Sequence, residues 1–365
     1  MTHTTQLIGI TGNIATGKSV VRRMLANCGA LGIDADLLAH RSMYPGGAAY
    51  QAVIETFGEH ILTEGGQISR PQLAQIVFQH PDQLSLLEAL VHPAVIQATL
   101  ARIYHTDQPL AAVEAVKLLE AGMDAICTAI WVSHASEAVQ MERLLHTRNM
   151  SEPDARARMA QQPSHTAHMA QADVIIDTEG SFESTWQQVK WALHDTIQIE
   201  IGAIVPILPD WHWQPAGKLP KERLAAFWKA YSGDSADALF ESLGMHMVLP
   251  ILKGETLKAL VLWDSWNFTA TLQRVITADR ANLPAGVVLK AFEAQALTQQ
   301  CEILLVSPVT ACEHNLDMSG FQQYLEHFTY PAWQQACGKV TEDSSPPWIK
   351  VLAQPFEPDA TVSTV

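Results

Sequence analysis

One stretch near the amino end limits the fold of this chain more than any other feature. Residues 12–19 read G-N-I-A-T-G-K-S and directly follow the apolar run L-I-G-I at residues 7–10. A strand followed by this loop and a helix is the phosphate-cradling pattern, in which glycines let main-chain amides face a polyphosphate. The sequence therefore predicts an α/β fold that binds a nucleoside triphosphate. Lys18 is expected near the β- and γ-phosphates and Ser19 on Mg²⁺.

Size and composition allow two domains and exclude some classes of protein. The chain has 365 residues, of which 48% are hydrophobic, and its formal net charge is −15. Such a charge argues against a protein that coats nucleic acid. The five cysteines are scattered without metal-ligand spacing, as in reduced thiols. Because no signal peptide is visible and no apolar stretch approaches the ~20 residues of a membrane span, we expect a cytoplasmic protein with no membrane or nucleic-acid partner.

The pattern of the sequence changes near residue 200. Before this point, short apolar runs alternate with segments of helical periodicity, which predicts a parallel sheet flanked by helices. The strands are expected at 7–11, 30–34, 111–116, 126–132 and 174–176, and the last helix at 181–197. We predict a kinase-type domain over 1–200, a linker over 201–220, a smaller α+β domain over 221–345 and a poorly ordered tail over 346–365.

In the second domain, the sequence predicts strands and helices in a fixed order. A Lys-Gly-Glu turn predicts a hairpin of strands 246–252 and 256–263. The elements expected after it are a strand at 268–276, a helix at 284–299, a strand at 302–307 and a helix at 321–328.

Acidic residues at the ends of two predicted strands are the candidate catalytic groups. Asp34 ends the second strand, and ligands of parallel sheets bind beyond the carboxyl ends of strands. It can accept a proton from a hydroxyl nucleophile or hold a metal-bound water. The alternative is that Asp34 or Asp36 caps the following helix, and we assign that cap to Asp36. Glu114, in the third strand, is expected near Mg²⁺ through water or in a salt bridge with a residue such as Lys18.

Several motifs in chain order resemble dephospho-CoA kinase over residues 5–197. They are G-I-T-G-N-I-A-T-G-K-S, G-I-D-A-D-L-L-A-H from residue 32, I-S-R-P-Q-L from 68, L-V-H-P from 90, R-L-L-H-T-R-N from 143 and A-D-V-I-I-D from 172. The resemblance implies a P-loop kinase that uses ATP and Mg²⁺ to phosphorylate the ribose 3′-hydroxyl of dephospho-CoA.

The resemblance also implies roles for individual residues. The catalytic residues would be Asp34 as base, Lys18, and Arg148 as the lid arginine. The nucleotide-binding residues would be Gly12, Asn13, Ile14, Ala15, Thr16, Gly17, Lys18, Ser19 and Arg143. The metal ligand would be Ser19, and Arg70 and His92 would lie in the substrate-binding region. From their place after the third strand rather than from the resemblance, Glu114 and Lys117, with Glu120, are also expected to bind the substrate.

Simpler interpretations remain open for four of these residues. Arg143 can instead pair with Glu142 or Glu137 on a solvated helix face. His92 can pack or cap at a helix start, Arg70 can be a surface residue, and Glu114 can be structural. The chain departs from the family pattern at Asn13, Lys117, Asn149 and Thr178. Since both loop glycines remain, the phosphate cradle is expected to be intact.

The second domain resembles a GNAT-type acetyltransferase core in its element order. In that family a glycine-rich loop before the central helix binds the pyrophosphate of acyl-CoA. The corresponding residues 278–286 hold a single glycine, Gly286, and add the negative charge of Asp279. We therefore expect a degenerate, non-catalytic module for dimerisation or regulation. Two other functions stay open for the whole chain: a kinase for another small hydroxyl acceptor, and a nucleotide sensor whose kinase-like half regulates the second domain.

Overall fold

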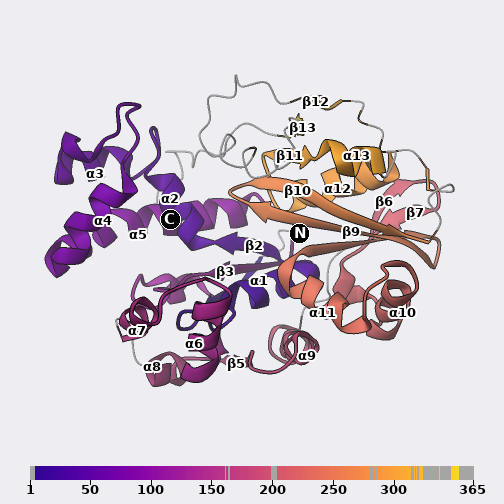
Figure 1. Cartoon of the computed structure of the whole chain (residues 1–365), viewed down its shortest axis with the longest axis horizontal. Helices are drawn as coiled ribbons and strands as arrows, with labels where there is room; N and C mark the ends of the chain where they lie inside the picture. Colours follow the sequence, from indigo (N-terminus) through magenta and orange to yellow (C-terminus); the bar gives the residue numbers. More distant parts are fainter. Residues whose placement is uncertain are drawn as a thin grey trace.

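The structure is a computed structural model in which two sheets are joined through a common core. It describes residues 5–160, 162, 165–198, 204–278, 283–284, 286–313, 316, 318, 320–323, 337 and 347–352. Figure 1 shows the second sheet, β6 to β13, at one end of the molecule and the helices α3 to α5 at the other.

The first sheet is parallel, as the sequence predicts. Its strands are β1 (Gln6–Thr11), β2 (Leu31–Asp34), β3 (Leu110–Glu114), β4 (Ala129–His134) and β5 (Val174–Asp177). They lie in the order β2-β3-β1-β4-β5, with every pair parallel. The central strands are buried almost throughout because helices cover both faces. The carboxyl ends of β1, β2 and β3 therefore meet at one edge, where Thr11, Asp34 and Glu114 lie.

Helices connect these strands. On the amino-terminal side they are α1 (Lys18–Asn27), α2 (Ala35–Ser42), α3 (Tyr50–Phe57), α4 (Arg70–Gln79) and α5 (Pro81–Tyr104), with a 3₁₀ turn at Glu59–Ile61. After β3 they are α6 (Glu137–His146), α7 (Glu152–Ala160), α8 (His165–Ala170) and α9 (Phe182–Ala192). A 3₁₀ turn at Met123–Ile126 precedes β4, so the predicted strand at 126–132 begins too early, and a π-helical turn at Leu193–Ile197 ends α9.

The second sheet has eight described strands. They are β6 (Val205–Leu208), β7 (Trp211–Trp213), β8 (Met247–Lys253), β9 (Thr256–Trp266), β10 (Thr269–Thr277), β11 (Ile303–Val306), β12 (Gln322–Gln323) and β13 (Trp348–Val351). Their order is β12-β13-β11-β10-β9-β8-β7-β6, and β10 and β11 are the parallel pair. The helices are α10 (Lys221–Tyr231), α11 (Ala236–Met245), α12 (Val287–Thr298) and α13 (Pro308–Glu313), with a 3₁₀ turn at Ala216–Lys218. From β8 to β11 this order follows the predicted one: three strands, a helix and a further strand.

Four stretches differ from the sequence expectation or lie partly outside the described residues. The expected linker, 201–220, contains β6 and β7, which pair with each other, and β7 also pairs with β8. The expected disordered tail contains β13, which pairs with β11. Of the expected helix at 321–328, residues 322–323 form a strand and 324–328 lie outside the described residues, as does most of the 278–286 loop.

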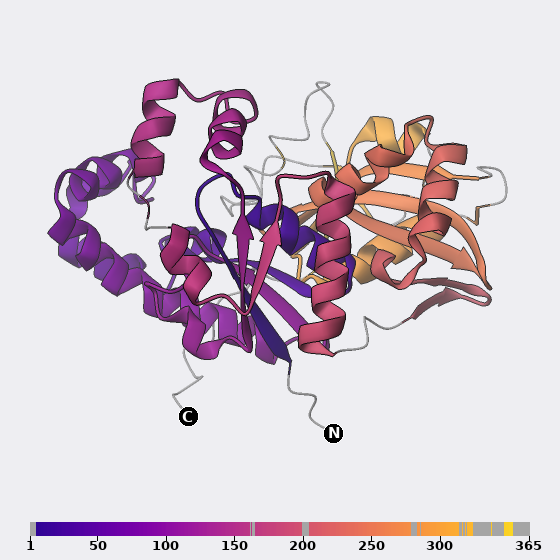
Figure 2. The same ribbon diagram turned by 90° about the horizontal axis from the view of Figure 1, so that it is seen from below.

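The two sheets share a hydrophobic core through α1. One cluster of buried side chains includes Ile8, Met24 and Trp131 from the first region and Leu243 and Val248 from the second. The helices α9 and α11 pack against each other and against α1, and Figure 2 shows α9 between the first sheet and the C-terminal region. The second region is therefore built onto the helix that follows the phosphate loop.

The helix α5 corrects one expectation. Over Pro81–Tyr104 it is long and apolar enough, by length and composition, to cross a membrane, whereas no such stretch was expected. Its residues Val91, Ala94, Val95 and Ala98 pack in the core beneath β3 and α2. A core helix passes the same test, so this measure is weak evidence for a membrane span.

Candidate active site

The phosphate loop joins β1 to α1 with backbone angles that glycine makes possible. Gly12 has φ 139° and Gly17 has φ 87°. A Cβ atom on Gly12 would lie 2.5 Å from the carbonyl oxygen of Ser133, so a larger residue would clash there. Ala15 also has a positive φ, 59°, which marks a tight turn at the loop's tip. The loop backbone can therefore lie close to a phosphate, as the motif predicts, and it lies at the amino end of a helix.

Lys18 lies inside this loop. Its ammonium donates to the carbonyl oxygens of Gly12 at 2.8 Å and Asn13 at 2.9 Å. Burial lowers the pKa of Lys18 to about 8, and the charges of Glu114 and Asp36 partly oppose that shift. An anionic ligand in the loop would favour the charged ammonium, so ligand binding and protonation of Lys18 are coupled.

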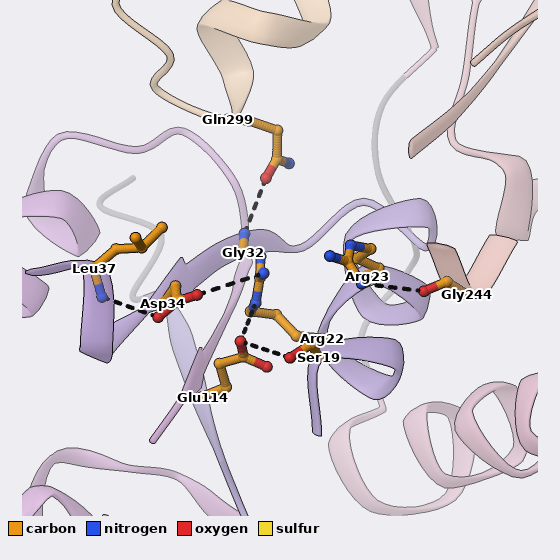
Figure 3. Close-up of polar contacts among 9 residues, drawn as sticks. All are labelled: Ser19, Arg22, Arg23, Gly32, Asp34, Leu37, Glu114, Gly244 and Gln299. Carbon is orange, nitrogen blue, oxygen red and sulfur yellow. Dashed lines mark hydrogen bonds and ion pairs between the residues drawn. The ribbon is translucent and has the colours of Figure 1, made fainter. Parts of the chain in front are cut away.

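A chain of four polar side chains leads from the loop to Asp34 (Figure 3). The Ser19 hydroxyl donates to Glu114 Oε1 at 3.1 Å. Arg22 Nε lies 3.4 Å from the same oxygen, and Arg22 Nη2 lies 3.9 Å from Asp34 Oδ2. The predicted salt bridge of Glu114 therefore exists, but its partner is Arg22 rather than Lys18. Sequence reasoning missed Arg22, although its place one helical turn after Ser19 on the same face was a usable signal.

Asp34 caps α2 as well as facing the site. Its Oδ1 accepts from the backbone amide of Leu37 at 3.1 Å, so the cap that was assigned to Asp36 belongs to Asp34. Burial and the charge of Glu114 raise the pKa of Asp34 to about 6, against the opposing charge of Arg22. Burial, then Glu114, also raises the pKa of Asp36. A carboxylate with a pKa near 6 is suited to accept a proton close to neutral pH.

Arg143 ties the helix α6 to the phosphate loop. Its Nη1 donates to the carbonyl oxygen of Ala15 at 2.9 Å and to Thr178 Oγ1 at 3.1 Å. The Thr178 hydroxyl lies 2.8 Å from the carbonyl oxygen of Thr16, so it also contacts the loop. Arg143 therefore contacts the loop rather than a neighbouring glutamate. Thr178, known from the sequence only as a departure from the family pattern, is part of the loop's support.

Arg148 is exposed in the connection between α6 and α7. Burial is the main cause of the low pKa of Lys18, and the charge of Arg148 adds to it. The next residue, Asn149, has φ 50°, a left-handed conformation that asparagine tolerates well. Arg148 therefore lies on a turn that is open to solvent.

Three of the proposed substrate-binding residues lie away from the chain that joins Ser19 to Asp34. Arg70 begins α4, His92 is in α5, and Lys117 follows β3. Arg70 Nη2 lies 2.8 Å from His40 Nε2, and burial together with Arg70 lowers the pKa of His40 to about 4. Lys117 forms an ion pair with Glu88 on α5. Burial lowers the pKa of His92, on the same helix. Arg70 and Lys117 thus contact His40 and Glu88, whereas Glu114 belongs to the chain that reaches Asp34.

The donor set near Ser19 fits Mg²⁺. Among the described residues, no group of three or more His, Cys, Asp or Glu side chains is placed to hold a metal ion. Mg²⁺ typically keeps several waters and takes one or two protein oxygens together with phosphate oxygens. The buried Glu114 Oε2 has no hydrogen-bond partner in the described part of the chain, and Ser19 Oγ lies next to Glu114. Both are oxygen donors of the required kind beside the phosphate loop.

Comparisons with known proteins point to one family for the first region. The family model described as dephospho-CoA kinase matches residues 6–184. Dephospho-CoA kinase of Carboxydothermus hydrogenoformans is 37% identical over 222 residues, covering 58% of this chain and 97% of that protein. The enzyme of Shouchella clausii is 38% identical over 192 residues, covering 52% and 98%. Among solved structures, TT1252 from Thermus thermophilus has 26% identity and a TM-score of 0.47, covering 53% of this chain and 98% of that one.

Proposed function

This chain belongs to the dephospho-CoA kinase family, and we propose that it transfers the γ-phosphoryl group of ATP to the ribose 3′-hydroxyl of dephospho-CoA. The products are CoA and ADP. The observation that carries the proposal is the polar chain from Ser19 through Glu114 and Arg22 to Asp34. It connects the phosphate loop with a carboxylate at the end of the adjoining parallel strand.

Asp34 is the proton acceptor in this proposal. The 3′-oxygen attacks the γ-phosphorus, its proton passes to Asp34, and the bond to the bridging oxygen of ADP breaks. The Leu37 amide and Arg22 hold the carboxylate from two sides. Phosphoryl transfer needs positioning and charge neutralisation more than covalent chemistry, and fixed contacts of this kind supply positioning.

The cations of the site bind and neutralise the phosphates. The loop amides and Lys18 hold the β- and γ-phosphates, and Arg143 keeps the loop in place through the carbonyl oxygen of Ala15. Arg148 closes on the transferring group, where a planar guanidinium donates two parallel hydrogen bonds. Mg²⁺, held by Ser19 and by Glu114 through water, supplies further charge neutralisation when bound. Arg70, His92 and Lys117 bind the dephospho-CoA.

The test is ADP release by the full chain with ATP and Mg²⁺, with dephospho-CoA compared against adenosine, AMP and shikimate. The expected result is stimulation by dephospho-CoA, with CoA identified by mass spectrometry. Lys18→Ala is the matched inactive control. Stimulation by another acceptor alone would replace the proposed substrate. ATP binding without stimulation by any acceptor would favour the nucleotide-sensor function. The cytoplasmic location and a homo-oligomer through the second domain stay predictions.

A further inference from the structure

We propose that Gln299 and Glu302 of the C-terminal region position Asp34, so that the second region is part of the kinase site. This proposal rests on the proposed function, because it concerns the residue that accepts the proton. Asp34 lies at the junction of β2 and α2. The side chains of Gln299 and Glu302 hold both of those elements.

Gln299 holds the strand β2. Its Oε1 accepts from the amide of Gly32 at 3.0 Å (Figure 3). Its Nε2 donates to the carbonyl oxygen of Ala30 at 2.8 Å. β2 is an edge strand that pairs with β3 on its other side. The backbone N–H and C=O groups on the open side of an edge strand need hydrogen-bond partners. The buried side-chain amide of Gln299 supplies these partners, as a neighbouring strand would. Gly32 lies two residues before Asp34.

Glu302 holds the helix α2. Its Oε1 lies 2.5 Å from Arg41 Nη2, and both side chains are buried. Arg41 is in the last turn of the helix that Asp34 caps. A buried ion pair with this geometry is costly to break, because both charges have been removed from water. The strand before Asp34 and the helix after it are thus fixed to residues only three positions apart.

A strained turn supports this contact. Asn267 and Phe268, the two residues between β9 and β10, both have a positive φ, 49° and 64°. That conformation is unfavourable for a bulky side chain and persists where the surroundings hold it. The guanidinium carbon of Arg41 lies 4.2 Å from the centre of the Phe268 ring, and that of Arg102 lies 4.6 Å from it. The turn therefore packs against the same arginine of α2 that pairs with Glu302.

Arg102 adds a link from α5 to Gln299 and to its neighbour Gln300. Its Nη2 donates to the backbone carbonyl oxygen of Gln299 at 3.1 Å, and the side chain of Gln300 donates to the carbonyl oxygen of Arg102 at 2.8 Å. Arg102 and Gln300 therefore join α5 of the first region to the C-terminal region. The Gln300 contact reaches α5 and does not touch β2, which makes Gln300 a suitable control position.

The two regions also enclose a cavity beside Asp34. Its lining includes Arg22 and Asp34 from the first region and Asn267, Phe268, Gln299 and Cys301 from the second. The C-terminal side chains therefore form part of the wall around the proton acceptor. Because the phosphate loop is supported separately by Arg143 and Thr178, loss of the Gln299 contacts should disturb proton transfer while ATP binding is preserved.

The experiment compares Gln299→Met with Gln300→Met in the full chain. Methionine keeps the length of the side chain and removes its hydrogen bonds. For Gln299→Met we expect kcat to fall about 10-fold, with the KM for ATP within about 2-fold of wild type, because a small misplacement of a catalytic group is enough to slow the chemical step. Hydrogen exchange at the Gly32 amide should accelerate. Gln300→Met should match wild type in both measurements.

The outcomes separate this proposal from the proposed function. An active wild type in which Gln299→Met and Gln300→Met have the same kcat would overturn the positioning role alone. A wild type that does not phosphorylate dephospho-CoA would overturn the proposed function and this role with it. If Gln299→Met does not fold, Glu302→Gln tests the α2 contact in its place. It should lower kcat at unchanged KM for ATP, and an unchanged kcat would overturn the proposal.

Discussion

The guanidinium of Arg22 lies 3.9 Å from the carboxylate of Asp34, and the same group reaches Glu114 at 3.4 Å. Arg22 is thus the cation that opposes the effects raising the pKa of Asp34, which are burial, the charge of Glu114 and, least, the charge of Asp36. The three side chains form one electrostatic unit at the carboxyl ends of β2 and β3. The unit determines whether Asp34 is ionised near neutral pH.

Asp34→Asn should leave ATP binding nearly intact and lower kcat by roughly 10²–10⁴, the usual contribution of a general base. Asparagine caps helices as well as aspartate does, so the cap on α2 should survive and the melting temperature should change little. Steady-state kinetics and nucleotide binding by calorimetry measure the two effects. Unchanged turnover would remove Asp34 from the mechanism.

The pH profile of the wild type should show an acid limb near pH 6. A proton acceptor works only when it is ionised, and burial with Glu114 raises the pKa of Asp34 to about 6. Below that pH, kcat/KM for dephospho-CoA should fall about tenfold for each pH unit, and above it the profile should level off. The limb should be absent in Asp34→Asn. A flat profile between pH 5 and 7 in the wild type would contradict the assignment.

Arg22→Met should move that acid limb to higher pH. Arg22 lowers the pKa of Asp34, so its removal lets burial and Glu114 raise that pKa further. The free energy of unfolding should also drop by about 3–5 kcal/mol, since Glu114 would lose its buried partner. Adding Glu114→Gln should restore much of that stability. A limb that stays at its wild-type position would show that Arg22 does not control Asp34.

Arg143→Met should raise the KM for ATP on the order of 10-fold, with a smaller effect on kcat. The change removes a charged hydrogen bond to Ala15 and loosens the phosphate loop. Arg156→Met is the matched control, because Arg156 forms an exposed pair with Glu152 on α7 that is worth little. Equal KM values in the two variants would argue against a supporting role for Arg143.

Arg148→Met should lower kcat by roughly 10³-fold while ATP still binds. Loss of an arginine that contacts a transferring phosphoryl group lowers kcat by at least about this factor. The side chain is exposed in the connection between α6 and α7, so the protein should stay folded. Single-turnover kinetics with dephospho-CoA would isolate the chemical step. A rate equal to that of Arg156→Met would assign Arg148 to the surface.

The phosphate loop and the strand ends could be predicted because they depend on residues that are adjacent in the sequence. The loop at 12–19 carries its own glycines, and the strand before it and the helix after it follow from apolar runs and helical spacing. Asp34 and Glu114 come at the ends of parallel strands, so their shared edge followed from fold class alone. The cap on α2 was assigned to the wrong aspartate, because Asp34 and Asp36 are both suitable caps by residue type.

The expected linker and tail were misjudged for a different reason. Prolines and tryptophans at 201–220 and prolines near the end suggested irregular chain, yet β6, β7 and β13 form there. Strand formation depends on the partner strand that packing makes available, and propensity alone is a weak guide to it. β7 pairs with β8 and β13 pairs with β11, and in each case the partner strand is distant in sequence.

The nucleotide loop, the parallel sheet of the first region and the family resemblance could all be predicted from contiguous residues. The partners of those residues were not. Arg22 meets Glu114, and Gln299 meets Gly32, only after the sheet has assembled and the second region has packed onto α1. Such pairs join residues far apart in the chain, and no local pattern encodes them. Tertiary packing therefore decides how the Asp34 carboxylate is held.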